Sequence, residues 1–256
     1  MYDQIARYYD LVHDQLEDDV AFVKGLASDV DGRILELGCG SGRLLLPLAE
    51  AGHTVVGVDN APNMLARARR RIAGLPAQAQ QRVTLVQSDL RELELPSASL
   101  PMSMAVFGYN TFLHFQATEA GSLLRRLRDV LVDDALIYID IVNPFMLADA
   151  ADDRALRLEH TLLDSETGQV IQQFSSSWHA PEAQTLHVTW LFVAMPPGGG
   201  AVQRAVVEHA YHYQHPHELE LQLARAGFQV ANWFGDYDAS PFVEESERLL
   251  VLARPK

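Results

Sequence analysis

Short apolar runs alternate with segments of helical periodicity along the first 142 residues of the chain. The apolar runs lie at 33–38, 53–58, 82–87, 101–107 and 135–142. Helical spacing of apolar residues is found at 43–51, from 62 onward and at 118–131. Apolar strands that alternate with helices are typical of a parallel sheet covered by helices on both faces. The pattern therefore predicts an α/β fold.

The pattern changes between about 155 and 213, where β-rich runs follow one another directly. These runs lie at 156–164, 169–179, 185–195 and 201–213, and the turn sequences ETG, PE and PPGGG separate them. Runs and turns in this order are the signature of consecutive antiparallel hairpins. A helix at 216–226 and strands at 228–234 and 248–252 then resume the α/β pattern.

We therefore expect one α/β domain formed by residues 1–150 and 214–256, with an antiparallel β insertion at 151–213. The insertion follows a strand of the parallel sheet, so it should lie at the carboxyl edge, where ligands bind in open α/β folds, and act as a substrate lid. Near-helical spacing of apolar residues over 2–26 predicts one or two amphipathic helices before the first strand.

Composition narrows the possible partners. The chain has 256 residues, 48% of them hydrophobic and 21% charged, as in a folded soluble domain. Its formal net charge of -14 argues against nucleic acid and anionic lipid surfaces as partners. A single cysteine fits a reducing compartment, and no secretory signal or membrane span is evident. We expect a cytoplasmic monomer or homodimer.

A glycine-rich loop, ELGCGSG at 36–42, lies where the first predicted strand turns into a helix. Glycines at such a turn let the backbone approach a ligand closely. A phosphate-binding loop would end in Lys and Ser or Thr, but Arg43 and Leu44 follow here. The dinucleotide fingerprint would place its third glycine at the position of Arg43. Both nucleotide-phosphate readings are therefore disfavoured.

Acidic residues stand at the ends of three successive predicted strands, at Glu36, Asp59 and Asp89. Glu36 precedes the glycine loop, where a carboxylate would repel a diphosphate and attract an ammonium group. Asp59 follows Gly38 by 21 residues, a position from which a carboxylate can accept both hydroxyls of a ribose. Asp89 could accept from an adenine amino group, with the Leu90 N–H beside it. Together they describe a nucleoside with a cationic tail and no phosphates.

At this point the sequence resembles the class I S-adenosylmethionine-dependent methyltransferases. The resemblance is carried by residues 36–69, by VQSDL at 86–90 and by FGYNTFLHF at 107–115, in the order of that family. It implies a Rossmann-like seven-stranded sheet and S-adenosylmethionine as the cofactor. The cofactor-binding residues that it implies, including a tyrosine of the N-terminal helix, are Tyr9, Glu36, Gly38, Cys39, Gly40, Gly42, Asp59, Asn60, Met64, Asp89, Leu90, Phe107 and Asn110.

The resemblance also suggests where the acceptor binds. The segment NTFLH at 110–114 is similar to one in glycine and related small-amine N-methyltransferases. Asn110 could hold a carboxylate, and His114 could orient or deprotonate the acceptor; the alternative is that His114 only packs in its loop. Tyr211, on the last run of the insertion, is a second catalytic candidate. The histidines near it alternate between the two faces of a strand, so we expect no metal site.

The expected activity is methyl transfer from S-adenosylmethionine to a nitrogen or oxygen of a small-molecule acceptor. Two alternatives remain open from the sequence. One is a binding module that holds S-adenosylmethionine without turnover. The other is an NAD-dependent oxidoreductase, which is disfavoured because Arg43 stands where the dinucleotide fingerprint has its third glycine. The basic run at 67–71 is interpreted as a solvated helix face.

Overall fold

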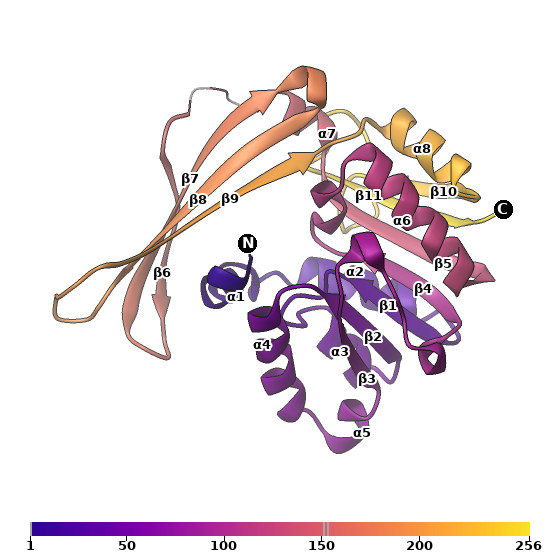
Figure 1. Ribbon diagram of the computed structural model, residues 1–256, viewed down its shortest axis with the longest axis horizontal. Helices are drawn as coiled ribbons and strands as arrows, with labels where there is room; N and C mark the ends of the chain where they lie inside the picture. Colours follow the sequence, from indigo (N-terminus) through magenta and orange to yellow (C-terminus); the bar gives the residue numbers. More distant parts are fainter. Residues whose placement is uncertain (1, 151, 153) are drawn as a thin grey trace.

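The computed structural model describes residues 2–150, 152 and 154–256, and these form two sheets flanked by helices (Figure 1). The larger sheet has seven strands in the order β10-β11-β5-β4-β1-β2-β3. Their bounds are Arg33–Leu37 (β1), Thr54–Asp59 (β2), Val83–Gln87 (β3), Met102–Phe107 (β4), Leu131–Val142 (β5), Phe228–Phe234 (β10) and Arg248–Pro255 (β11). The seven-stranded α/β fold expected from the sequence is confirmed.

The strand order reverses between β1 and β4. All neighbours from β3 to β5 pair in parallel, and β11 alone runs antiparallel to both of its neighbours. The chain winds outward in opposite directions from β1 and from β4, so the connections leave a crevice at the carboxyl ends of these two strands. Such a topological switch point is where open α/β sheets bind their ligands.

Helices cover both faces of this sheet because its central strands are apolar on both sides. One face packs against α6 (Ala117–Val130) and α8 (Pro216–Arg225). The other packs against α2 (Asp18–Ala27), α3 (Leu45–Glu50) and α4 (Pro62–Ala73), as Figure 1 shows. Two short helices, α5 (Ala77–Gln80) and α7 (Pro144–Ala148), were not predicted because four or five residues carry too little periodicity.

The smaller sheet contains four antiparallel strands in chain order. They are β6 (Arg157–Asp164), β7 (Gln169–Ala180), β8 (Thr185–Met195) and β9 (Gln203–His212), which agrees with the predicted hairpins. The expected start of the insertion at residue 151 lies outside the described residues, as does residue 153. One edge of the sheet, β9, lies against the short turn η4 (Thr111–His114) that follows β4.

The N-terminal segment forms η1 (Tyr2–Gln4) and α1 (Ala6–His13) and lies between the two sheets (Figure 1). Ile5 and Tyr8 pack against the inner face of the smaller sheet, where the Tyr8 ring stacks on Phe192 at 5.2 Å. On the other side, the Asp3 carboxylate accepts from the Asn63 backbone N–H at the start of α4. The segment therefore bridges both sheets instead of lying on one of them.

The basic run on α4 is a solvated face only in part: Arg69 and Arg70 are exposed, as the sequence suggested, but Arg67 and Arg71 are not. Arg67 and Arg71 form ion pairs with Asp10 of α1, whose carboxylate is only 3% exposed. Asp10 also accepts from the Ser41 hydroxyl of the glycine loop at 2.6 Å. The two arginines thus fix the N-terminal helix over the glycine loop, an arrangement that depends on contacts 57 residues apart in the chain. No helix among the described residues is long and apolar enough to cross a membrane.

Candidate cofactor and acceptor site

A cavity of about 390 Å³ lies at the carboxyl ends of β1, β2 and β4, under the N-terminal segment and beside the edge of β9. It brings together most of the residues predicted for the site, namely Tyr9, Glu36, Gly38, Cys39, Gly40, Asp59, Asn60, Met64, Asp89, Leu90 and His114. Four others predicted for it do not line the cavity: Gly42, Phe107, Asn110 and Tyr211.

Glu36 is a buried carboxyl group whose Oε2 atom has no hydrogen-bond partner. Its side chain lies at the end of β1, is 4% exposed and lines the cavity. Burial raises the pKa of Glu36 to about 8, although the charge of nearby Arg43 acts in the opposite direction. A carboxyl in this state gains most from a cationic partner, because such a partner would offset the cost of ionising it in a buried place.

The glycine loop turns sharply under the cavity, with left-handed backbone at two points that line it. Gly38 has φ of 73°, and a Cβ there would lie 2.6 Å from the Thr111 side chain. Gly40 has φ of 53°, but a Cβ there would meet only the Met64 sulfur at 4.0 Å. Gly38 is therefore required for packing, whereas the open side of Gly40 leaves room for a ligand against the backbone.

Asp59 braces this loop from the end of β2. Its two carboxylate oxygens accept the backbone N–H groups of Gly40 and Ala61, each at 2.8 Å. Burial raises the pKa of Asp59, while these backbone bonds favour its charged form. A carboxylate has about four acceptor sites, so beyond its backbone contacts Asp59 can still accept a hydrogen bond from a ligand in the cavity.

Asp89 and Leu90 line the far end of the cavity beyond β3. The Asp89 carboxylate caps the short turn η2 (Leu90–Glu92) by accepting from the Arg91 N–H at 2.9 Å. Asn60 and Met64 border the cavity from the start of α4. The polar and apolar groups at this end match the edge and the faces of a flat heterocycle.

The amide oxygen of Asn110 is hydrogen-bonded within the protein. Its backbone is left-handed, with φ of 69°, and its Oδ1 accepts from the Val142 N–H at 2.7 Å and from Arg248 at 3.2 Å. The amide oxygen therefore ties β4 to β5 and β11 and is not free for a ligand. The Phe107 side chain is fully buried, and the next residue, Gly108, borders the cavity, so only the backbone carbonyl of Phe107 could face a ligand there, as the resemblance implies.

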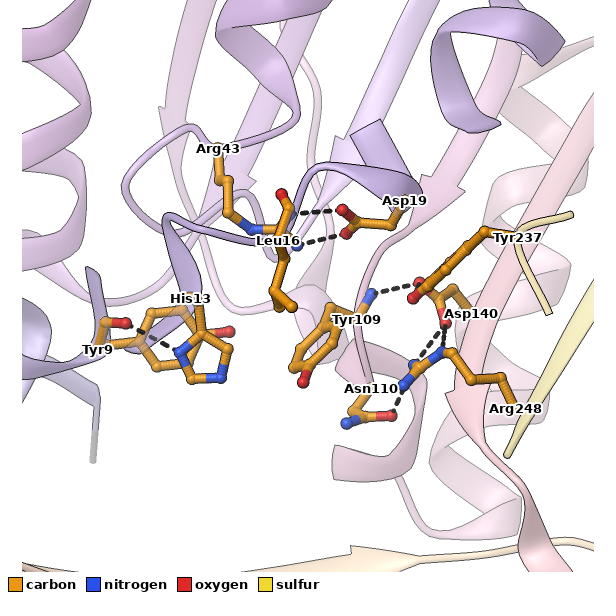
Figure 2. A network of polar contacts seen from close by, with 10 residues as sticks. All are labelled: Tyr9, His13, Leu16, Asp19, Arg43, Tyr109, Asn110, Asp140, Tyr237 and Arg248. Atoms are coloured by element: carbon orange, nitrogen blue, oxygen red, sulfur yellow. Dashed lines mark hydrogen bonds and ion pairs between the residues drawn. The ribbon is translucent and has the colours of Figure 1, made fainter. Parts of the chain in front are cut away.

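Figure 2 shows a polar network around Tyr109, beside the cavity at the end of β4. The Tyr109 ring, which lines the cavity, lies between the guanidinium groups of Arg248 at 4.9 Å and Arg43 at 5.6 Å. Arg248 pairs at 2.5 Å with Asp140, which is 1% exposed and also accepts from the Tyr237 hydroxyl at 3.0 Å. The network holds two arginines in fixed positions beside the cavity.

Arg43 is a cavity residue that the sequence argument used only as an exclusion. Its guanidinium donates to both oxygens of Asp19, a carboxylate 1% exposed, and to the Leu16 carbonyl at 3.1 Å. Burial disfavours the charge of Arg43, but the hydrogen bonds and the negative charge of Asp19 outweigh it and raise the pKa of Arg43, so its charge is permanent. Its position directly after the last loop glycine was the available signal, but the partner Asp19 is visible only in the folded chain.

His114, on η4, lines the cavity beside the edge of β9. Its Nε2 atom is 2.9 Å from the hydroxyl of Tyr2, a cavity residue that was not predicted. Burial lowers the pKa of His114 to about 4, so the imidazole is neutral near pH 7. Tyr9 lines the same cavity and stacks at 3.9 Å on His13, whose Nδ1 is 2.8 Å from the Tyr9 carbonyl oxygen.

Tyr211 lies one layer behind the cavity wall, where its ring is 5.6 Å from that of His114. Burial raises the pKa of its hydroxyl far above neutral pH. His212, the next residue on the strand, also borders the cavity, but its side chain lies on the opposite face of the sheet, where its Nδ1 is 2.9 Å from the Thr185 hydroxyl. Among the described residues, no group of three His, Cys, Asp or Glu side chains could hold a metal ion.

The comparisons with known proteins agree with this geometry. Residues 34–134 match a family described as a methyltransferase domain. The cypemycin N-terminal methyltransferase of Streptomyces sp is 27% identical over 269 residues, which cover 98% of this chain and 96% of that protein.

Two solved structures share the fold. The CcbJ methyltransferase of Streptomyces caelestis superposes with a TM-score of 0.75 at 25% identity, covering 94% of each chain. CalS10, an S-adenosylmethionine-bound amino pentose methyltransferase from Micromonospora echinaspora, gives a TM-score of 0.68 at 19% identity, covering 95% of this chain and 91% of that one. The resemblance inferred from the glycine loop and the three acidic residues is confirmed.

Proposed function

We propose that this chain, which is an S-adenosylmethionine-dependent methyltransferase of the small-molecule type, transfers the methyl group to an amine nitrogen of its acceptor. The observation that carries this proposal is the protonation state of His114, at the end of the cavity that we assign to the acceptor. His114, the titratable group placed there, is held neutral by burial, with a pKa of about 4.

A base this weak favours an amine over a hydroxyl acceptor. A hydroxyl must lose its proton to become a strong nucleophile, which calls for a basic group or a metal. The neutral fraction of an amine already presents its lone pair, so the N–C bond can form as the S–C bond breaks once the two are aligned, and the resulting ammonium gives its proton to water after release. One relative is named for methylating an N-terminus and one for methylating an amino pentose, which supports the choice of nitrogen.

The residues present fit S-adenosylmethionine. The unpartnered Oε2 of Glu36 suits the ammonium group of the methionine end, and the open side of Gly40 lets the ligand approach the backbone. We assign the ribose hydroxyls to Asp59, the adenine edge to Asp89 and Leu90, and its faces to Asn60 and Met64. Arg43 is the cation best placed for the carboxylate of the methionine end.

When bound, the cofactor supplies an electrophilic methyl group on a sulfonium centre. The chain then has three tasks: to hold the acceptor nitrogen in line with that methyl, to exclude water and to keep the donor fixed. We assign the first task to His114 and the second to the N-terminal segment, whose Tyr2 and Tyr9 close the cavity. Tyr211, behind the cavity wall, keeps a positioning role through its contact with His114.

The domain division at 1–150, 151–213 and 214–256, with the smaller sheet as a substrate lid, is part of this proposal. So is a cytoplasmic enzyme, as a monomer or homodimer, that does not act on nucleic acid. The net charge of -14 supports the last point, because it disfavours contact with a phosphate backbone.

Glu36 should make cofactor binding release protons. With a pKa of about 8 in the free protein, Glu36 is mostly protonated at pH 7. An ammonium group beside it would lower that pKa, so binding should release close to one proton, and affinity should rise as pH approaches 8 from below. Calorimetry with S-adenosylhomocysteine in buffers of different ionisation enthalpy measures this release. Glu36→Gln should abolish it, whereas a wild-type heat that is independent of the buffer would contradict the assignment.

The test of the acceptor atom is a transfer assay with matched probes. D-glucosamine, L-alanyl-L-alanine and cyclohexylamine each offer an amine, and D-glucose offers only hydroxyls. We expect S-adenosylhomocysteine to form with at least one amine and not with glucose, with mass spectrometry locating the added methyl on nitrogen. Methylation of glucose instead would contradict the amine proposal. Tight cofactor binding with no turnover on any probe would favour the non-catalytic binding module.

His114→Ala should slow transfer more than it weakens cofactor binding. Because the ring orients the acceptor without being protonated, we expect kcat/KM to fall about tenfold, by the same factor at pH 6 and pH 8. Affinity for S-adenosylhomocysteine should change by less than about twofold. The matched control is His53→Ala, before β2 at the opposite ends of the strands. An unaltered rate in His114→Ala would leave that histidine only a packing role.

A further inference from the structure

A closed circuit of five aromatic rings lies directly behind the acceptor side of the cavity. The N-terminal segment, η4 and the smaller sheet contribute its members, which we call the aromatic circuit: Tyr2, His114, Tyr211, His209 and Trp190. Neighbouring ring centroids are 5.4 Å (Tyr2–His114), 5.6 Å (His114–Tyr211), 4.7 Å (Tyr211–His209), 4.2 Å (His209–Trp190) and 6.2 Å (Trp190–Tyr2) apart. Two of the rings, Tyr2 and His114, also line the cavity.

His209 is the anomalous member of this circuit. Its side chain is only 5% exposed, yet neither Nδ1 nor Nε2 has a hydrogen-bond partner. Buried polar groups in folded proteins almost always have a partner, because a group without one destabilises the fold. A phenylalanine would pack between Trp190 and Tyr211 without this cost. Packing alone therefore does not explain an imidazole at this position.

The position of His209 suggests what its nitrogens meet. It lies one ring away from the cavity, because its ring centroid is 6.1 Å from that of His114. Tyr2, which closes the circuit on the cavity side, belongs to a three-residue turn at the start of the chain. The Tyr2 hydroxyl lies 2.9 Å from His114 Nε2 and contacts Tyr211, so an acceptor group that takes the place of this hydroxyl would come next to the His209 ring. The imidazole is thus placed next to the point where the acceptor must enter.

The chemistry of His209 limits the kind of ligand group that its imidazole can bind. A neutral imidazole offers one donor and one acceptor, a combination that matches a hydroxyl or an amide. Burial lowers the pKa of His209 to about 3, so it stays neutral and does not attract anions. Apart from His209, the circuit consists of Tyr2, Trp190, Tyr211 and a neutral His114. None of these side chains carries a carboxylate that could hold a second cation.

We propose that His209 is a specificity-determining residue of the acceptor subsite, where its imidazole hydrogen-bonds a hydroxyl or amide group next to the reacting amine. The inference rests on the proposed function, since it assumes an amine acceptor in this cavity. It predicts that acceptors with a polar neighbour to the amine depend on His209 and that those without one do not.

The test is His209→Phe, with His187→Phe as the matched control. His187 stacks on Trp178 at 3.7 Å and belongs to the same sheet, but its side chain points to the opposite face from His209. We expect His209→Phe to lower kcat/KM about tenfold for D-glucosamine or L-alanyl-L-alanine, and to leave cyclohexylamine unchanged. We also expect its Tm to rise, because an unmet buried polar group is removed. His187→Phe should leave kcat/KM unchanged for all of these probes.

Two results would overturn the inference. One is a lower Tm in His209→Phe, which would reveal a structural partner of His209. The other is a kcat/KM of His209→Phe equal to that of the wild type for every probe. If the wild-type protein methylates none of the probes, the amine proposal fails separately. The subsite is then tested by the ¹⁵N resonances of His209 in the protein saturated with S-adenosylhomocysteine. A shift caused by D-glucosamine or L-alanyl-L-alanine, but not by cyclohexylamine, would support it, and no shift with any probe would overturn it.

Discussion

Replacing Asp140 by alanine is expected to lower the free energy of unfolding by about 3–5 kcal/mol, since it leaves the buried Arg248 guanidinium without its partner. Asp140 is 1% exposed and Arg248 12% exposed, so water cannot take the place of the lost carboxylate. The same carboxylate holds Tyr237 and lies 3.3 Å from the Tyr109 N–H (Figure 2). The loss should appear as a fall in Tm of about 10 °C in a thermal melt.

Two further variants separate this effect from a general loss of charge. Adding Arg248→Met to Asp140→Ala removes both charges and should recover part of the stability. Asp133→Ala breaks a surface pair with Arg128, in which the aspartate is 96% exposed, and should change stability by less than about 0.5 kcal/mol. Equal Tm shifts for Asp140→Ala and Asp133→Ala would show that the buried network does not stabilise the fold as described.

Asp59→Ala is expected to weaken binding of S-adenosylmethionine and S-adenosylhomocysteine by about 1–3 kcal/mol, or about 5- to 150-fold in Kd. Two causes add up. The variant loses the carboxylate that we assign to the ribose hydroxyls, and it releases the Gly40 N–H that the carboxylate now fixes at 2.8 Å. Calorimetric titration of the folded variant measures the change.

The companion variant is Asp59→Asn, which keeps one acceptor oxygen and can therefore still brace one of the two N–H groups, Gly40 or Ala61. If the ribose contact dominates, Asp59→Asn should lose nearly as much affinity as Asp59→Ala. If loop bracing dominates, Asp59→Asn should recover part of the affinity together with part of the Tm that Asp59→Ala loses. Unchanged Kd in Asp59→Ala would remove the ribose assignment altogether.

The part of the site nearest the glycine loop could be predicted because it is local in the chain. Glu36, Gly38 and Gly40 lie within five residues, and Asp59 ends the adjacent strand. Parallel strands that pair in register bring their carboxyl ends together, so residues at strand ends meet in space. The same logic placed Asp89 and Leu90 correctly beside the cavity.

The residues that were missed or misplaced depend on long-range contacts. Tyr2 reaches His114 across 112 positions, and Asn110 bonds Arg248 across 138. Nothing in the local pattern of NTFLH distinguishes an asparagine that holds strands together from one that holds a ligand. Arg67 and Arg71 of α4 were misinterpreted for the same reason, since their acidic partners lie on α1 and directly after it, far earlier in the chain.

By itself, the sequence determined the alternation of strands and helices, the four-stranded insertion and the glycine loop with its three acidic residues. These features follow from backbone periodicity and from residues that lie close along the chain. Which polar side chains are hydrogen-bonded within the protein, and which have no partner, became visible only in the folded chain. Asn110 and Arg248 satisfy each other, whereas Glu36 and His209 are buried without partners, because burial and pairing are set by segments that meet only when the chain has folded.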